Sequence, residues 1–393
     1  MRKFIVGVLT AVTVVSGISL APVASAATGF TNTTTSNGLG DNIVYGVYAV
    51  GSTIYAATGH GLSISTDDGD HFANKTWPDI ADDVVLGVFA VGSTIYAATY
   101  GGLSISIDGG TSFDNKTTID GLGDNQVRDV YAVGSTIYAA THGGLSISTD
   151  GGDHFTNKTT IDGLGDNIVF GVYAVGGTIY AATFGGLSIS TDGGDHFTNK
   201  TTIDGLGENW VFGVYVVGST IFVATNGGGL GVSTDNGDHF TSKTTSNGLG
   251  DNNVFGVYAV GGTIYAATQT GLSISTDVGG RFSSYTTADG LGDNIVNGVY
   301  AVGGTIYAAT QGGLSIYTAR AASGPTAPLQ AYAINENDTC GTNAPASVNI
   351  PGLVNSQFVG WGKSWQQWPN GGIGGYVCTR QPFYTTAGTW SVQ

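Results

Sequence analysis

Seven acidic residues recur at one position of a repeated sequence, after Gly-Leu-Gly or its equivalent. A ring of carboxylates could hold a hard cation, because such cations take oxygen ligands, or could supply the acid pair that hydrolyses a glycoside. The same side chains also cap tight turns by accepting from backbone amides. Because every acid has copies in other repeats, we favour turn caps and expect no metal site and no cofactor. The seven are Asp41, Asp82, Asp124, Asp166, Glu208, Asp251 and Asp293.

Histidine, the usual acid–base and metal-binding side chain, also recurs one repeat apart. Four copies stand directly before a phenylalanine, and on an outer rim at this spacing they do not converge on a metal: His71, His154, His196 and His239. The chain contains neither a G-x-S-x-G elbow nor an H-E-x-x-H motif. We therefore name no catalytic residue and favour a protein that is not an enzyme.

The elements that position these residues follow from a phrase, T-I-Y-A-A-T or a close variant, that occurs seven times. Its isoleucines are spaced by 41, 42, 42, 42, 43 and 42 residues. This period, with strand-like content in each unit, is typical of a β-propeller of four-stranded blades. We expect an all-β, seven-bladed propeller over residues 27–318. The isoleucines are Ile54, Ile95, Ile137, Ile179, Ile221, Ile264 and Ile306.

One repeat, residues 163–202, shows how a blade is built. Its first strand is apolar on both faces, as expected for an innermost strand buried between two neighbouring blades. A Gly-Gly hairpin turn follows, and the apolar content falls from the first strand to the last. The expected strands cover 169–175, 178–183, 187–190 and 196–201.

The two ends of the repeat array explain each other. The seventh unit stops at Tyr317 without a fourth strand, while residues 29–34 read G-F-T-N-T-T and match the fourth-strand phrase H-F-T-N-K-T. We infer that the N-terminal strand completes blade seven. Closing the ring in this way removes the exposed sheet edges of an open array.

The charge distribution argues against nucleic-acid binding. The chain has 28 acids against 12 bases, a net charge of −16, whereas nucleic-acid sites need clustered Lys and Arg. Five lysines occupy one position on the last strand of a unit, where they are expected to guard an exposed edge. They are Lys75, Lys116, Lys158, Lys200 and Lys243.

The chain ends predict an exported protein with a small second domain. Residues 1–26 have basic, apolar and small-residue segments typical of a secretory signal peptide, and no later segment is apolar enough to span a bilayer. A linker at 319–330 precedes a Trp-rich domain at 331–393. Its cysteines, Cys340 and Cys378, are expected to form a disulfide, with a thiol metal site as the weaker alternative.

The turn between the third and fourth strands resembles a known motif. Six times it reads Ser-x-Asp-x-Gly-x-x-Phe, as in 65–72 and 106–113, with further copies from Ser148, Ser190, Ser233 and Ser275. This is similar to the Asp-box, or bacterial neuraminidase repeat, whose last aromatic is usually Trp. The resemblance covers residues 29–318 and implies a propeller in which the box is structural. That family includes sialidases, other glycoside hydrolases, sorting receptors and photosystem assembly factors.

A sialidase of that family uses three arginines to hold the substrate carboxylate, beside a tyrosine and a glutamate. The repeats here contain only Arg128 and Arg281, and Glu208 is their only glutamate. The arginine cluster cannot be built, so sialidase activity is not expected. A secreted glycoside hydrolase of another kind and a protein-assembly scaffold remain the alternatives.

Positions that differ between repeats can carry recognition, because positions shared by all of them build the scaffold. They lie after the second strand and before or within the first, in loops expected on one end of the ring. We expect a secreted, monomeric binding protein that recognises a glycan or an extracellular protein there; neutral drift at exposed turn tips is the alternative. The candidates are Tyr100, His142, Phe184, Asn226, Gln269, Gln311, Gln126, Arg128, Trp210 and Asn253.

Overall fold

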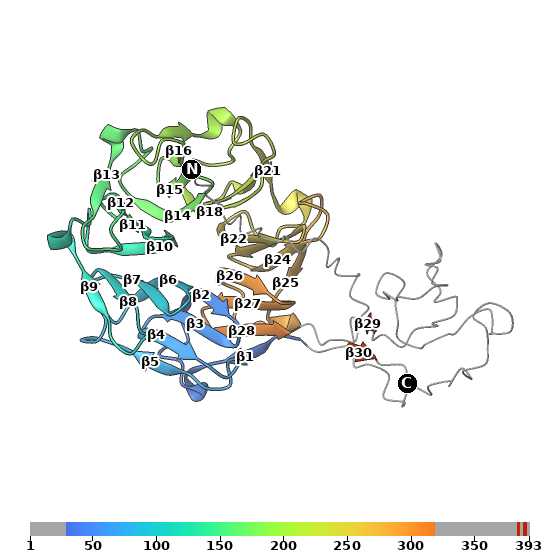
Figure 1. Ribbon diagram of the computed structural model, residues 1–393. Coiled ribbons are helices and arrows are strands. Elements are labelled where there is room, and N and C mark those ends of the chain that lie inside the picture. Colours follow the sequence, from blue (N-terminus) through green and yellow to red (C-terminus); the bar gives the residue numbers. More distant parts are fainter. Residues whose placement is uncertain (1–28, 319–382, 386–387, 391–393) are drawn as a thin grey trace, which may run out of the picture. The chain divides into compact units, whose positions relative to one another are not determined.

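The computed structural model describes residues 29–318, 383–385 and 388–390. Residues 29–318 form a seven-bladed β-propeller whose blades are antiparallel four-stranded sheets arranged around a central axis (Figure 1). The fold predicted from the repeat is confirmed. No helix in these described ranges is long and apolar enough to cross a membrane.

In six blades the strands run in sequence order from the axis to the rim, and in the seventh the order is β26, β27, β28 and then β1 at the rim. The innermost strands are β2 (Val44–Val50), β6 (Val85–Val91), β10 (Val127–Val133), β14 (Val169–Val175), β18 (Val211–Val217), β22 (Val254–Val260) and β26 (Val296–Val302). The second strands are β3 (Thr53–Thr58), β7 (Thr94–Thr99), β11 (Thr136–Thr141), β15 (Thr178–Thr183), β19 (Thr220–Thr225), β23 (Thr263–Thr268) and β27 (Thr305–Thr310).

The outer half of each blade is shorter. The third strands are β4 (Gly61–Ser65), β8 (Leu103–Ser106), β12 (Gly144–Ser148), β16 (Gly186–Ser190), β20 (Gly229–Ser233), β24 (Gly271–Ser275) and β28 (Gly313–Thr318). The rim strands are β5 (Ala73–Lys75), β9 (Asp114–Lys116), β13 (Thr156–Lys158), β17 (Thr198–Lys200), β21 (Thr241–Lys243), β25 (Ser283–Tyr285) and β1 (Thr31–Thr33). In blade four the rim strand begins two residues later than expected, because His196 and Phe197 belong to the preceding turn.

The N-terminal strand closes the ring, as predicted. β1 pairs antiparallel with β28, with Thr31 opposite Ile316 and Thr33 opposite Leu314. The chain therefore completes its last blade with its first strand, and both ends of the repeat array are held in one sheet.

The core lies between blades, because both faces of each second strand are buried. On β15, Ile179 packs with Leu145 of the preceding blade, whereas Tyr180 packs with Val214 of the following blade. Successive side chains of a strand point to opposite faces, so one T-I-Y-A-A-T phrase seals two interfaces. Fully burying a side chain such as Ile179 contributes roughly 1.5–3 kcal/mol.

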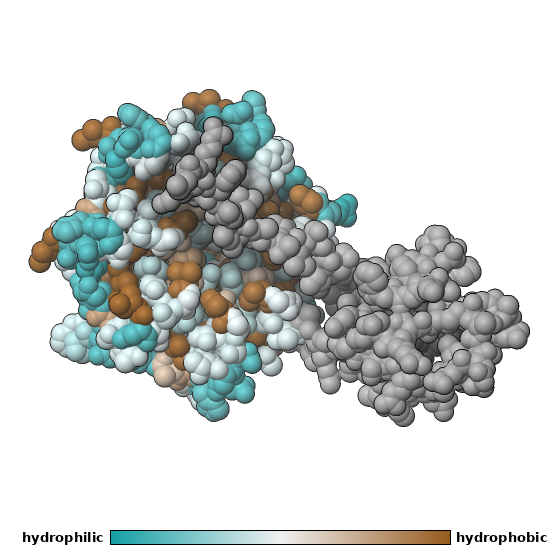
Figure 2. Space-filling view, viewed as in Figure 1, coloured by the Kyte–Doolittle hydropathy of each residue, from teal (hydrophilic) through white to brown (hydrophobic). Residues whose placement is uncertain are grey.

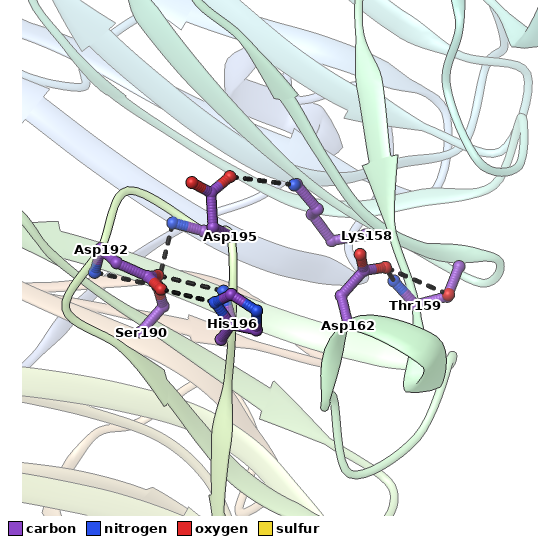
Figure 3. Close-up of polar contacts among 8 residues, drawn as sticks. Lys158, Thr159, Asp162, Ser190, Asp192, Asp195 and His196 are labelled. Carbon is purple, nitrogen blue, oxygen red and sulfur yellow. Dashed lines mark hydrogen bonds and ion pairs between the residues drawn. The ribbon is translucent and has the colours of Figure 1, made fainter.

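The turn between β16 and β17 shows how the Asp-box motif is held (Figure 3). Ser190 Oγ donates to Asp192 Oδ1 at 2.7 Å, and the same oxygen accepts from the His196 amide at 3.0 Å. These bonds hold the pKa of Asp192 well below its usual range. The His196 ring bonds the other carboxylate oxygen and is largely exposed, so it has the structural role expected from the sequence.

Short 3-10 helices, which the sequence reading treated as loops, connect most blades. In η3 (Thr160–Asp162), Thr159 and Asp162 form a reciprocal capping box, and Gly163 at φ 96° ends the helix in the left-handed region that favours glycine. The others are η1 (Thr35–Asn37), η2 (Thr118–Asp120), η4 (Thr202–Asp204), η5 (Thr245–Asn247) and η6 (Thr287–Asp289).

The rim lysines are less exposed than the sequence suggested. The side chains of Lys116, Lys158 and Lys200 are only 12%, 17% and 18% exposed. Lys158 Nζ lies 3.7 Å from Asp195 Oδ1 in the next blade (Figure 3). The predicted edge-guard role of the lysines stays a prediction; in these three the ammonium lies within 4 Å of an acid.

In the second unit, residues 319–393, the described backbone is one antiparallel hairpin of β29 (Phe383–Thr385) and β30 (Gly388–Trp390). The predicted signal peptide, the linker and the disulfide between Cys340 and Cys378 lie outside the described residues.

Candidate functional site

The two sets of variable positions lie side by side at one end of the propeller, here called the mouth face. In every blade the residue after the second strand donates its N–H to the carbonyl of the residue just before the first strand. Phe184 N, for example, lies 3.1 Å from Ile168 O, and Asn226 N lies 3.0 Å from Trp210 O. This hydrogen bond recurs in every blade, so it holds the backbone of the two variable positions in the same place while their side chains differ.

The seven acids of the mouth face cap their own loops. In six of them the carboxylate accepts from the amide two residues on at 2.7–2.8 Å, and Glu208 accepts from the Asn209 amide at 2.8 Å. This is the turn-capping role favoured from the sequence. The acids therefore stabilise the loops that carry the variable positions.

Each first strand carries a β-bulge at its mouth end. In β14 the register skips Phe170 between Val169 and Gly171, and a bulge re-aims its extra side chain. A Cβ on Gly171 would lie 2.9 Å from the Phe212 carbonyl of the next blade, so glycine permits the strands to approach. The bulged residues are Tyr45, Leu86, Arg128, Phe170, Phe212, Phe255 and Asn297.

Across blades three to six, the varied residues form a continuous cluster that we call the aromatic arc. Its ring centroids are separated by 5.8 Å for Phe170–Trp210, 4.9 Å for Phe184–Trp210 and 5.2 Å for Trp210–Phe212. The Phe212 and Phe255 rings are 5.5 Å apart. The arc consists of Arg128, Phe170, Phe184, Trp210, Phe212 and Phe255.

Arg128 forms the blade-three end of the aromatic arc. Its Cζ lies 4.8 Å from the Phe170 ring centroid, within cation–π range. One Nη lies 2.9 Å from His142 Nε2, which accepts the bond when the imidazole is neutral. Burial lowers the pKa of both side chains, and the guanidinium lowers that of His142 further. Arg128 Nε is buried without a partner in the described part of the chain.

Asp129, the next residue, replaces a glycine found at this position in the other six blades. Its carboxylate accepts from the Val130 amide at 2.9 Å and from the Val172 amide of the following blade at 3.0 Å. It also lies beside Gly87 of the preceding blade. Burial, partly offset by the two amides, raises the pKa of Asp129 to about 6. The carboxylate thus bonds its own blade and the following blade, and it lies beside the preceding one.

Seven aromatic rings encircle the axis, one from each first strand. Adjacent centroids are 4.7–5.0 Å apart around the whole circle. Burial, followed by the neighbouring phenols, raises the pKa of Tyr131, Tyr215 and Tyr300. The circle, here called the axial ring, consists of Tyr48, Phe89, Tyr131, Tyr173, Tyr215, Tyr258 and Tyr300.

The structure brings six of the ten candidate residues together in pairs. They are Arg128 with His142, Phe184 with Trp210, and Asn253 with Gln269, whose carboxamides are hydrogen-bonded. The other four are held in mouth-face loops by backbone bonds: Tyr100, Gln126, Asn226 and Gln311. A ligand-binding role for all ten stays a prediction.

The candidate list missed the part of the aromatic arc that comes from the bulges, namely Phe170, Phe212 and Phe255. The signal was present, because these positions also vary between repeats, but adjacency around the axis is needed to see one cluster. Asp129 was missed as well, although it is the only non-glycine at its position.

Solved structures share this fold at low sequence identity. The extracellular domain of the hybrid two component system BT3049 from B. thetaiotaomicron is 19% identical, with a TM-score of 0.61 over 73% of this chain and 41% of that one. YCF48 from Cyanidioschyzon merolae is 12% identical, with a TM-score of 0.56 over 74% and 98%. A structure of YCF48 bound to D1 peptide is 14% identical, with a TM-score of 0.55 over 70% and 93%.

These likenesses establish the class of the protein, a seven-bladed β-propeller. The chain spans about two fifths of the length of the BT3049 domain. No family model and no curated protein matches the sequence. The comparisons therefore show the fold alone, and the resemblance to the Asp-box rests on the repeated Ser-x-Asp-x-Gly-x-x-Phe turn.

Proposed function

We propose that this protein is an exported, non-catalytic binding protein that holds an extracellular glycan on its mouth face. The observation that carries the proposal is the aromatic arc. Side chains at positions that vary between repeats gather into one contiguous cluster of aromatic rings with Arg128 at its end. Drift at separate turn tips gives no reason for such continuity.

The chemistry of the aromatic arc suits a sugar. Phe184 is 45% exposed, so the apolar face of a sugar ring can stack on it. The Phe184 ring is at the same time held against Trp210, with 4.9 Å between the ring centroids. The Asn253 and Gln269 carboxamides, in the next blade, offer both donors and acceptors. Apolar surface with a few placed polar groups is the usual composition of a small-ligand site.

The fold neighbours are compatible with binding and suggest a second candidate. One is named as the extracellular domain of a two component system, and another is YCF48 bound to D1 peptide. An extended peptide on the same face is therefore the alternative ligand. Catalysis is disfavoured because the seven mouth-face acids are engaged as loop caps.

A glycan array probed with the purified protein tests this function, with Phe184→Ala and Trp210→Ala as variants. Burying an aromatic side chain under a ligand contributes roughly 1.5–3 kcal/mol, so each variant should weaken binding of a retained glycan by about 10- to 150-fold. Ile161→Ala is the matched control, because this 95% exposed side chain lies on η3, between blades three and four, and is not part of the aromatic arc. Binding that is unchanged in both variants, absence of any bound glycan, or turnover of the glycans contradicts the proposal.

A further inference from the structure

Among the described residues, Arg128 is the one lysine or arginine in the mouth-face loops and first strands. The lysines of the propeller lie on rim strands, and Arg281 belongs to the Asp-box turn after β24, which leaves from the opposite end of the blade. In a chain with a net charge of −16, Arg128 is an isolated cation of the mouth face and not part of a basic patch. Its role must be local.

The partners of Arg128 within residues 29–318 are all neutral. It stacks on Phe170 and donates to the His142 ring, and no acid lies within 4 Å of its guanidinium among these residues. The adjacent acid, Asp129, is engaged by two backbone amides. A partly buried cation is costly without an opposite charge. Arg128 therefore lacks the anionic partner that would offset its desolvation.

Arg128 also retains N–H donors with which it can bind an anionic ligand. A guanidinium carries five N–H groups in a planar fork. One Nη is directed at His142 Nε2, and the buried Nε has no partner. The remaining Nη donors match the two oxygens of a carboxylate. The fork lies over Phe170, which contacts the rest of the arc through Trp210.

We propose that the glycan held by the mouth is acidic, a uronate whose ring carboxylate is bound by Arg128 while its sugar ring stacks on the aromatic arc. This inference rests on the proposed function and narrows its ligand class. In a uronate the carboxylate is attached to the sugar ring itself. Charge and apolar face are thus close together in the ligand, just as Arg128 adjoins the aromatic arc, whose Phe184 ring is exposed.

The negative charge of the protein makes the proposal specific. Polyanions are repelled by the net charge of −16, and this repulsion is screened beyond about 8 Å at physiological salt. Unspecific attraction therefore does not mimic the expected result. A carboxylate-dependent gain in affinity has to come from a contact at short range.

Isothermal titration calorimetry of the full chain with oligogalacturonate and with its methyl ester tests the inference. The two probes share one backbone and differ in the carboxylate. We expect the acid to bind at least tenfold more tightly than the ester. Arg128→Gln should abolish this preference, so that the variant binds the acid no more tightly than the ester. Arg281→Gln, on the opposite face, is the matched control and should preserve the preference.

The outcomes separate the two proposals. Equal binding of acid and ester by the unsubstituted protein overturns the uronate inference and leaves glycan binding intact, and this comparison needs no variant. An acid preference that survives Arg128→Gln also overturns it. If neither probe binds but neutral glycans are retained on the array, the uronate inference fails alone. If no glycan binds, or only acidic peptides do, both proposals fail.

Discussion

Asp129→Asn is the sharpest test of the electrostatics of the channel wall. A tenfold change in a proton-binding constant is worth about 1.4 kcal/mol. An acid whose pKa rises from its ordinary 3.8 to about 6 on folding therefore costs the folded state about 3 kcal/mol once it is ionised. The penalty is absent well below the unfolded-state pKa of 3.8, where the carboxyl is protonated in both states, and complete about one pH unit above the folded-state pKa of about 6.

The sign of the pH dependence follows from proton binding. Between pH 4 and 6 the folded protein keeps the Asp129 proton that the unfolded chain has lost, so this group makes stability fall as the pH rises. The lowered pKa of His142 acts in the opposite direction over a neighbouring range, because its charged form is favoured in the unfolded chain. The difference between variant and wild type removes that contribution.

Denaturant midpoints at several pH values from 4 to 7.5 supply the measurement. From pH 4 to pH 7, the stability of Asp129→Asn should rise relative to wild type by about 2.5 kcal/mol. In addition, the variant should be less stable by an amount that does not depend on pH, because the Asn NH2 group cannot accept a hydrogen bond from one of the two amides. Asp124→Asn, which keeps an oxygen to cap the Gln126 amide, controls for loss of an acid in the same blade. A pH-independent difference for Asp129→Asn refutes the reasoning.

Two further predictions concern the axial ring and the Asp-box. Phe89→Tyr adds the one phenol missing from the axial ring. It should raise the free energy of unfolding by about 0.5–1.5 kcal/mol, the net value of a hydrogen bond. A lower denaturant midpoint would show that the axial ring has no room for the added hydroxyl. Asp235→Ala should lower the thermal midpoint near neutral pH, because its carboxylate holds Ser233 and the His239 amide, whereas Asp238→Ala in the same turn should not. Since those bonds lower the pKa of Asp235, its stabilisation is lost as the pH falls below about 4, and an Asp235 effect that persists unchanged at pH 2 contradicts the assignment.

The blades could be predicted from the sequence because each carries its pattern locally. Val169–Val175 and Thr178–Thr183 were located without error, since a Gly-Gly turn fixes the hairpin register between them. The 3-10 helix at Thr160–Asp162 was missed, although Thr159 and Asp162 have the spacing of a capping box. One turn of helix has no apolar periodicity by which to identify it.

The candidate site could be predicted only in part. Variation between repeats identified the mouth-face loops and residues such as Arg128 and Phe184. It did not identify the pairing of Arg128 with His142 and Phe170, which lie 14 and 42 residues away in the chain. Nor did it show that three lysines would be covered, because burial of a side chain depends on the neighbouring blade.

The sequence alone determined the number of blades, the strand order within them and the closure of the ring by residues 29–34, because a repeated local pattern has few ways to bury both of its faces. Only the tertiary structure decided which varied residues meet. Bending the array into a circle brings the bulge of each blade against the next, and this contact turns separate substitutions into the aromatic arc. It also leaves Arg128 without an acidic partner within residues 29–318 and holds Asp129 between three blades, where burial opposes its charge.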